Sequence, residues 1–355
     1  MIKIAVPQPD SEQTRSFRTH ASYVRAFREL ALGGSWTGLE AATTRLHSLA
    51  ADQLYKSSRV PCGADRDQVT SCLRRAWTTA SLLEATHSLA EDSEIVRLAN
   101  GWGAVQTYYV LYNAAQALLV AEGHERPKQH EQTKRQFVDL WAYRTAKLAP
   151  WSLAAAHPTV KESDADGFLG GPGRRLDVSL HPWTAWQGDQ AWDIAAKALR
   201  TTRAALTEDR LRKARERKLS DRRKAWLADS KTRTELGKKA RSSEPRSVNL
   251  TAVERAAAEQ RVRPVTVADY LYRLRVKANY EDITVFADGP ASDAEAAAMA
   301  SDLVDLASAT LLVHEVRIAA RIGSKELVRV MDDVLLRSTA YIGHLGLRRD
   351  LHARL

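Results

Sequence analysis

Two short polar segments of this sequence contain residue types that could carry acid–base chemistry. One is a turn from Lys128 to His130, and the other contains Arg275, Asn279 and Tyr280. A guanidinium beside an imidazole suits cleavage of an RNA phosphodiester by the RNA's own 2′-hydroxyl, because the guanidinium neutralises the developing charge while the imidazole transfers a proton. Such a reaction requires neither a metal ion nor a cofactor, and we expect none.

Helices with one apolar face must position both segments. The first is expected to end near Gly123, and its apolar side chains recur every three or four residues: Val105, Tyr108, Tyr109, Tyr112, Ala115, Leu118 and Leu119. The second has a core seam of Val267, Leu271, Leu274 and Ala278. Beside that seam runs a polar stripe with Arg275, Asn279 and Asp282. Both patterns predict helices inside a bundle, where the stripe holds either chemistry or a buried polar network.

Together these segments resemble the HEPN superfamily of prokaryotic helical bundles. In that family a helix rich in Tyr and Ala leads to a Lys-Thr-His turn, and a later helix carries Arg, two or three residues and then Ala-Asp-Tyr. This sequence has Lys128-Gln129-His130, then Phe137, and later Arg275-Val276-Lys277-Ala278-Asn279-Tyr280. Gln129 stands where the family has a hydroxyl residue, and Asn279 stands where it has a carboxylate. The resemblance covers residues 66–145 and 265–322, about half of the chain.

The resemblance implies a metal-independent endoribonuclease of a toxin–antitoxin, stress or anti-phage defence system. Its catalytic residues would be Arg275, His130, Asn279 and Tyr280, with Arg126 and Lys128 binding the nucleic acid. It also implies a homodimer or a larger complex that acts on RNA, with tRNA among the candidates.

A second hypothesis is a noncatalytic nucleic-acid-binding or scaffold subunit of a defence complex. HEPN ribonucleases carry an Arg and a His four to six residues apart near the start of a late bundle helix. None of the pairs with such a spacing lies within Arg273–Ile322: Arg15–His20, Arg174 or Arg175–His181, and Arg337–His344. A buried Arg, Asp and Tyr network that fixes two helices is the corresponding structural interpretation.

The net charge of +10 is concentrated in one segment. Residues 200–246 contain 17 Lys or Arg and 7 Asp or Glu, so the rest of the chain is balanced. Strong helix formers predict a solvated basic helix that contacts nucleic-acid phosphates. The candidate contacts are Arg212, Lys213, Arg215, Arg217, Arg222 and Arg223. An exposed linker helix without a ligand is the alternative.

Composition and helical periodicity predict an all-α protein: an antiparallel, HEPN-like bundle with an N-terminal helical extension and a basic, partly irregular insertion. We expect an extension at 1–60, half-bundles at 66–147 and 265–322, an insertion at 148–264 and a C-terminal helix at 323–355. Residues 150–190, rich in Pro, Gly and Trp, are expected to be irregular. No run approaches about 20 apolar residues, so we expect no membrane span and a cytoplasmic location. Cys62 and Cys72, the two cysteines, are expected to be free thiols.

Overall fold

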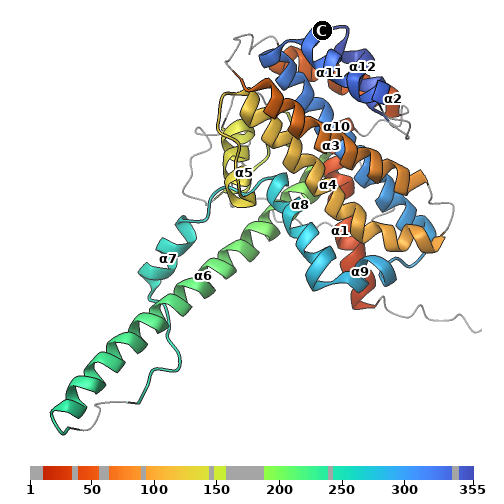
Figure 1. The fold of residues 1–355 in the computed structure, drawn as a ribbon. Helices are drawn as coiled ribbons and strands as arrows, with labels where there is room; N and C mark the ends of the chain where they lie inside the picture. Colours follow the sequence, from red (N-terminus) through yellow and green to blue (C-terminus); the bar gives the residue numbers. More distant parts are fainter. Residues whose placement is uncertain are drawn as a thin grey trace, which may run out of the picture.

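The computed structural model describes residues 11–33, 39–55, 64–88, 93–143, 148–156, 188–238, 243–337 and 344–355. Of the residues described, 82% are helical, and Figure 1 shows a bundle of packed helices from which one long helix projects. Within the described ranges the only β pairing is an isolated bridge between Ala155 and Val265. The all-α prediction is therefore confirmed.

Two long helices, α4 (Ser93–Ala121) and α10 (Asp293–Ile322), pack along each other at the centre of the bundle. Helix α3 (Arg66–Ser88) packs against both, and α1 (Glu12–Leu32) packs against α10. Buried side chains lie on nearly every face of α10, as expected of a helix surrounded by others. Helix α10 is also long and apolar enough to cross a membrane, but 78% of its most apolar window is buried inside the bundle, as in a core helix.

Shorter elements complete the bundle. They are α2 (Leu39–Ala50), η1 (Ala51–Tyr55), α5 (His130–Phe137), η2 (Val138–Ala142), α8 (Val267–Val276), η4 (Lys277–Glu281), α9 (Ile283–Asp288), α11 (Ser324–Arg337) and α12 (Leu345–His352). The C-terminal helix expected at 323–355 is found as two helices, α11 and α12, and the segments 130–142 and 267–288 each consist of two or more helical pieces. Breaks of this kind carry little signal in apolar periodicity, since both pieces keep their apolar residues on the core side.

One continuous apolar core joins the parts that the sequence suggested as separate units. It contains Phe17 from α1, Leu118 from α4, Leu271 from α8 and Leu351 from α12. Residues 148–156 also reach this core, where Trp151 is fully buried and donates a hydrogen bond to Thr310 Oγ1 at 3.2 Å. The start of the expected irregular stretch is thus anchored, and 157–187 lie outside the described residues.

The projecting arm consists of α6 (Gly188–Glu235) and α7 (Ala252–Gln260), which lies alongside it (Figure 1). Helix α6 begins in the core, where Ile194 and Leu199 are buried, and then leaves the bundle as its apolar residues give way to charged ones. Thr251 and Glu254 form a capping box that starts α7. Helicity of the basic segment is confirmed through Glu235, the last residue of α6.

Candidate functional site

Arg275, on α8, lies in a cage of tyrosine rings. Its guanidinium carbon is 5.7 Å from the ring centre of Tyr108, 5.2 Å from that of Tyr109 and 5.6 Å from that of Tyr272. The Nε atom is buried and has no hydrogen-bond partner among the residues that the structure describes. Within the described ranges no carboxylate forms an ion pair with Arg275. The cage therefore holds a positive charge that the bundle stabilises through ring faces rather than through an anion.

The residue type at position 279 contributes to the lack of a counter-charge at Arg275. It lies four residues after Arg275, the spacing at which an acidic side chain would face the guanidinium on the same helical surface. An amide at this position cannot neutralise the cation. Arg275 therefore receives no counter-charge from this position.

His130 lies against the same rings. Its Nδ1 is 2.8 Å from the hydroxyl oxygen of Tyr108, and its ring centre is 4.5 Å from that of Tyr112 and 5.7 Å from that of Tyr272. Burial lowers the pKa of His130 below its usual value, and the charges of Arg275 and Lys134 lower it further. The imidazole is consequently neutral near pH 7. Among the described residues nothing hydrogen-bonds to its Nε2, which can accept a proton in the tautomer whose Nδ1–H donates to Tyr108.

The turn before α5 fixes the position of His130. Helix α4 ends at Ala121, and Gly123 then adopts a φ of 85°, a left-handed conformation that favours glycine. Gln116 on α4 holds the turn, because its Nε2 donates to the carbonyl of Pro127 at 2.8 Å and to the hydroxyl of Tyr112 at 2.9 Å. Its Oε1 accepts from Arg126 Nε at 3.1 Å. The loop and the tyrosine helix thus form one hydrogen-bonded unit.

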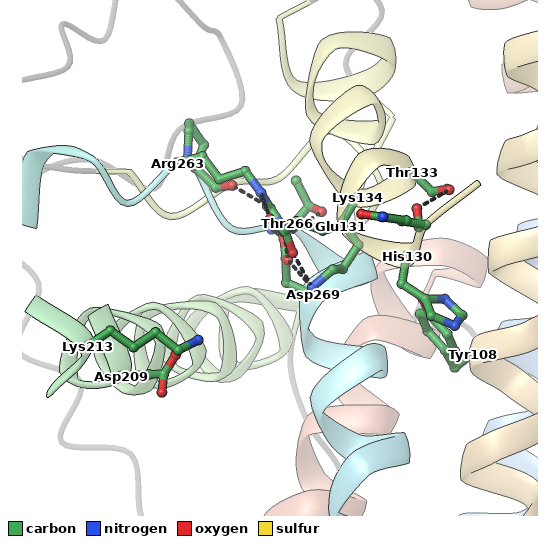
Figure 2. A network of polar contacts seen from close by, with 12 residues as sticks. Tyr108, His130, Glu131, Thr133, Lys134, Asp209, Lys213, Arg263, Thr266 and Asp269 are labelled. Carbon is green, nitrogen blue, oxygen red and sulfur yellow. Dashed lines mark hydrogen bonds and ion pairs between the residues drawn. The ribbon is translucent and has the colours of Figure 1, made fainter. Parts of the chain in front are cut away.

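An ionic network built around the buried Asp269 and Lys134 braces α5 against α8 beside His130 (Figure 2). Arg263 donates to both carboxylate oxygens of Asp269 at 2.8 and 2.5 Å, and its Nε donates to Glu131 at 3.1 Å. Lys134 is 2.9 Å from Glu131 and 3.7 Å from Asp269. Asp269 also accepts from the backbone N–H of Thr266 at 3.0 Å, so it caps α8 as well.

The charges within this network are mutually compensated. Burial opposes the charged form of Arg263, but the hydrogen bonds and charge of Asp269, with Glu131 beside it, raise its pKa above the usual value. Burial alone would raise the pKa of Glu131, whereas the charges of Arg263 and Lys134 hold it below the usual value. Lys134 thus has two carboxylate partners, while Arg275 has none. This is the kind of structural network that the sequence left open as an alternative, and it lies next to the Arg275–His130 pair rather than replacing it.

The structure brings some of the candidate catalytic residues together and leaves others apart. His130 and Arg275 contact the same tyrosine rings although 145 positions separate them in the chain. In the described part of the chain, no hydrogen bond or ring contact joins Asn279 or Tyr280 to His130. Tyr280 lies on η4 with 68% of its surface exposed. Lys128 is exposed in the turn, and Arg126 is bound to Gln116.

Three contributors to the site were not among the sequence candidates. Tyr108 was assigned only to the apolar face, and Tyr272 and Lys134 were not singled out. Helical spacing could have identified the last two, since Tyr272 lies three residues before Arg275 and Lys134 four residues after His130. The Lys134 ammonium is 4.0 Å from the ring centre of Tyr272, which connects the two helices.

The three Arg–His pairs identified by spacing do not form this site. His20 is half-buried, and its ring stacks on Phe286 with 6.0 Å between ring centres. His344 begins α12 and lies 3.4 Å from Glu84. Arg174, Arg175 and His181 lie outside the described residues, as does Cys62, whereas Cys72 is a buried free thiol. The pair that the fold does create, Arg275 with His130, comes from distant segments.

Ion pairing divides the cations of the arm into two groups. Arg212 pairs with Asp209 at 2.5 Å and Glu216 at 2.7 Å, Lys213 pairs with Asp209 at 2.7 Å, and Arg223 pairs with Glu244 at 3.3 Å. Arg215, Arg217 and Arg222 are exposed and form no ion pair with any residue that the structure describes. Arg210, Arg217, Arg222 and Arg261 line a groove of about 670 Å³ between α6 and α7. The unpaired group is the one available to phosphates.

Two observations complete the description of the site. The described ranges contain no group of three or more His, Cys, Asp or Glu side chains arranged to hold a metal ion.

Comparison with protein-family models, with curated proteins and with solved structures found no match to this chain.

Proposed function

We propose that this protein is a HEPN-like ribonuclease that binds RNA through its basic arm and cleaves it at the Arg275–His130 pair. One observation carries the proposal: an arginine without a carboxylate partner shares its tyrosine cage with a neutral histidine. Structural ion pairs in this protein contain both signs of charge, whereas this pair lacks the anion. A phosphodiester would supply it.

In this reaction His130 Nε2 takes the proton of a 2′-hydroxyl, and the 2′-oxygen forms a bond to phosphorus. The bond from phosphorus to the 5′-oxygen breaks, and that oxygen takes a proton from water, whose hydroxide then receives the proton held by His130. The products are a 2′,3′-cyclic phosphate and a 5′-hydroxyl. Arg275 stabilises the charge that develops on the phosphoryl oxygens, while Tyr108 fixes the ring of His130 through Nδ1.

The arm supports the choice of a polyanionic substrate. Arg215, Arg217 and Arg222 have no ion-pair partner in the described structure, and such cations bind a phosphate backbone by releasing its condensed counterions. The resemblance to HEPN proteins adds further proposals: tRNA as one candidate RNA, a homodimer or larger assembly, a cytoplasmic location and a role in a toxin or defence system.

A noncatalytic RNA-binding subunit is the second candidate. It is favoured by the arm itself, whose unpaired cations bind nucleic acid without help from His130, and by the separation of Asn279 and Tyr280 from the histidine. This candidate predicts salt-sensitive RNA binding without product formation.

Incubation of the protein with tRNA and with bulk RNA tests the proposal. Arg275→Ala and His130→Ala should each lower the cleavage rate by about a hundredfold or more. Arg273→Ala is the matched control, since Arg273 lines a different cavity with His20 and should leave the rate unchanged. Equal cleavage by wild type, Arg275→Ala and His130→Ala would exclude this site. Binding without cleavage by wild type under any condition would leave the noncatalytic candidate.

A further inference from the structure

A groove of about 550 Å³ lies between α3 and α4, next to the tyrosine cage. Its apolar surface comes from Leu82, Trp102, Val105 and Tyr109. Trp102 is 55% exposed and Leu82 is 56% exposed, so the groove presents a large indole face to solvent. Such a surface is a platform on which a flat ring can stack.

One polar group in the groove has no partner. Gln106 is only 7% exposed, its Oε1 is buried, and no hydrogen bond to it occurs among the described residues. It lies four residues after Trp102 and three before Tyr109, so the three side chains form one stripe on α4. A buried carbonyl oxygen without a hydrogen bond is unfavourable, and a ligand with a polar edge in this groove could supply the missing donor.

A second amide and a cation lie in the same groove. Asn113 uses its Nδ2 to donate to the carbonyl of Tyr109 at 2.9 Å, which leaves its Oδ1 as an acceptor. Arg75 also lines the groove and forms no ion pair with any described residue. The groove therefore offers stacking, hydrogen bonding and a positive charge within one volume.

Tyr109 connects the groove to the cleavage site. Tyr109 lines the groove, and the guanidinium carbon of Arg275 lies 5.2 Å from the centre of its ring. A ligand stacked in the groove would therefore have its attached phosphate close to Arg275 or Arg75. Nucleotides have this combination of a planar base with N–H and acceptor groups and an adjacent anion.

We propose that this groove is a nucleobase-binding subsite, in which the base stacks on Trp102 and is recognised by the amide of Gln106. The inference rests on the proposed action on RNA and deepens it, because the subsite would choose which nucleotide lies beside the scissile phosphodiester. The ligand class follows from the unpaired Oε1 of Gln106. The position of the ligand follows from Tyr109, which lines the groove and also contacts Arg275.

Calorimetric titration of the full-length protein with the four 5′-mononucleotides, and with ribose 5-phosphate as the baseless probe, tests this inference without any cleavage step. We expect at least one mononucleotide to bind more tightly than ribose 5-phosphate. Trp102→Ala should weaken that binding roughly 5- to 150-fold, the range found for one base–aromatic stack. Trp192→Ala is the matched control, since Trp192 is a partly exposed tryptophan on α6.

Gln106→Leu keeps the size and buried character of the side chain but removes its hydrogen-bonding groups. We expect it to reduce the differences in affinity among the four bases while leaving ribose 5-phosphate binding unchanged. Equal affinity for all five probes, or mononucleotide binding that neither variant alters, would overturn the inference. So would a change in sedimentation caused by Trp102→Ala with nucleotide binding intact, because the groove would then be an interface between copies of this chain.

The two proposals fail in different ways. Base-dependent binding that persists in His130→Ala, without RNA cleavage by wild type, would refute the ribonuclease and retain the subsite. RNA cleavage that depends on His130 but is insensitive to Trp102→Ala and Gln106→Leu would retain the ribonuclease and refute the subsite.

Discussion

Arg348 and Arg275 both lie beside a histidine within the same bundle, but their surroundings differ. Arg348 Nε is 3.1 Å from Glu315 Oε2, and His352 Nε2 is 3.0 Å from the same oxygen. Trp77 Nε1 donates to the other oxygen of Glu315 at 2.6 Å, and the carboxylate is fully buried. Arg275 has tyrosine rings in place of this carboxylate.

The difference teaches which polar clusters of this protein can bind a ligand. Burial would raise the pKa of Glu315, but the charge of Arg348 and the bonds from His352 and Trp77 lower it to about 2. Every strong donor around Glu315 is therefore occupied by the fold itself. No described residue forms an ion pair with the Arg275 guanidinium or a hydrogen bond with His130 Nε2. On the arm, likewise, Arg212 is ion-paired with Asp209, whereas Arg217 forms no ion pair with a described residue.

The largest effect is expected when the paired cluster loses its anion. Glu315→Gln should destabilise the protein by about 3–5 kcal/mol, because Arg348 would remain buried without a counter-charge. Chemical denaturation measures the change. Arg275→Met is the comparison variant, and it should leave the free energy of unfolding nearly unchanged since no ion pair is broken. Similar losses in both variants would contradict the comparison.

Acid should act on three partly or fully buried histidines and on Glu315 in different pH ranges. Burial, with a contribution from Lys277, lowers the pKa of His20 to about 3, and burial lowers those of His47 and His314 to about 4. Their folded pKa values lie below the unfolded value of 6.5, so the unfolded chain binds protons first. Their contribution to stability is complete above about pH 6.5 and is lost progressively as the pH falls toward 4.

Glu315 follows a lower window. Its folded pKa of about 2 lies below its usual 4.5, so its contribution is present above pH 4.5 and is lost as the pH falls toward 2.

The urea midpoint of unfolding should be lower at pH 5 than at pH 7.5 because of the histidines. His20→Phe should reduce that fall, whereas identical midpoints at the two pH values would refute this assignment.

Removing unpaired cations from the arm should have a moderate effect on RNA binding. The double variant Arg217→Ala with Arg222→Ala should lower the dependence of log affinity on log salt by about 1.4, at about 0.7 for each phosphate contact to a single strand. Arg212→Ala with Arg223→Ala removes the same formal charge from ion-paired positions and should change the slope less. Equal slopes for the two double variants would show that net charge, rather than pairing, determines binding.

The smallest effect is expected at His130 itself. Arg275→Met should raise the pKa of His130, because the guanidinium charge contributes to lowering it. A pH titration followed by NMR of the imidazole C–H signals measures the shift. The same titration of Arg273→Met is the control, since Arg273 lies by His20. An unchanged pKa in Arg275→Met would show that the two groups of the proposed site are not electrostatically coupled.

Residue spacing and composition alone predict the all-α class, the core faces of the main helices and the location of the excess charge. The apolar periodicity of 105–119 and the seam from Val267 to Ala278 were predicted correctly, because burial of one helical face is written into local spacing. The changes from α-helix to π-helix after Phe137 and Val276 were not predicted, since the residues on both sides of each change keep their apolar side chains in the core.

Only the tertiary structure decided which cations are free. Asp269 neutralises Arg263, Glu315 neutralises Arg348 from 33 positions away, and no described carboxylate reaches Arg275. It also decided that Gln106 lines a groove next to Tyr109 while its Oε1 accepts no hydrogen bond from the described residues. Ion pairs and unpaired amides depend on distances between segments that the chain brings together, and residue spacing along a single helix does not contain those distances.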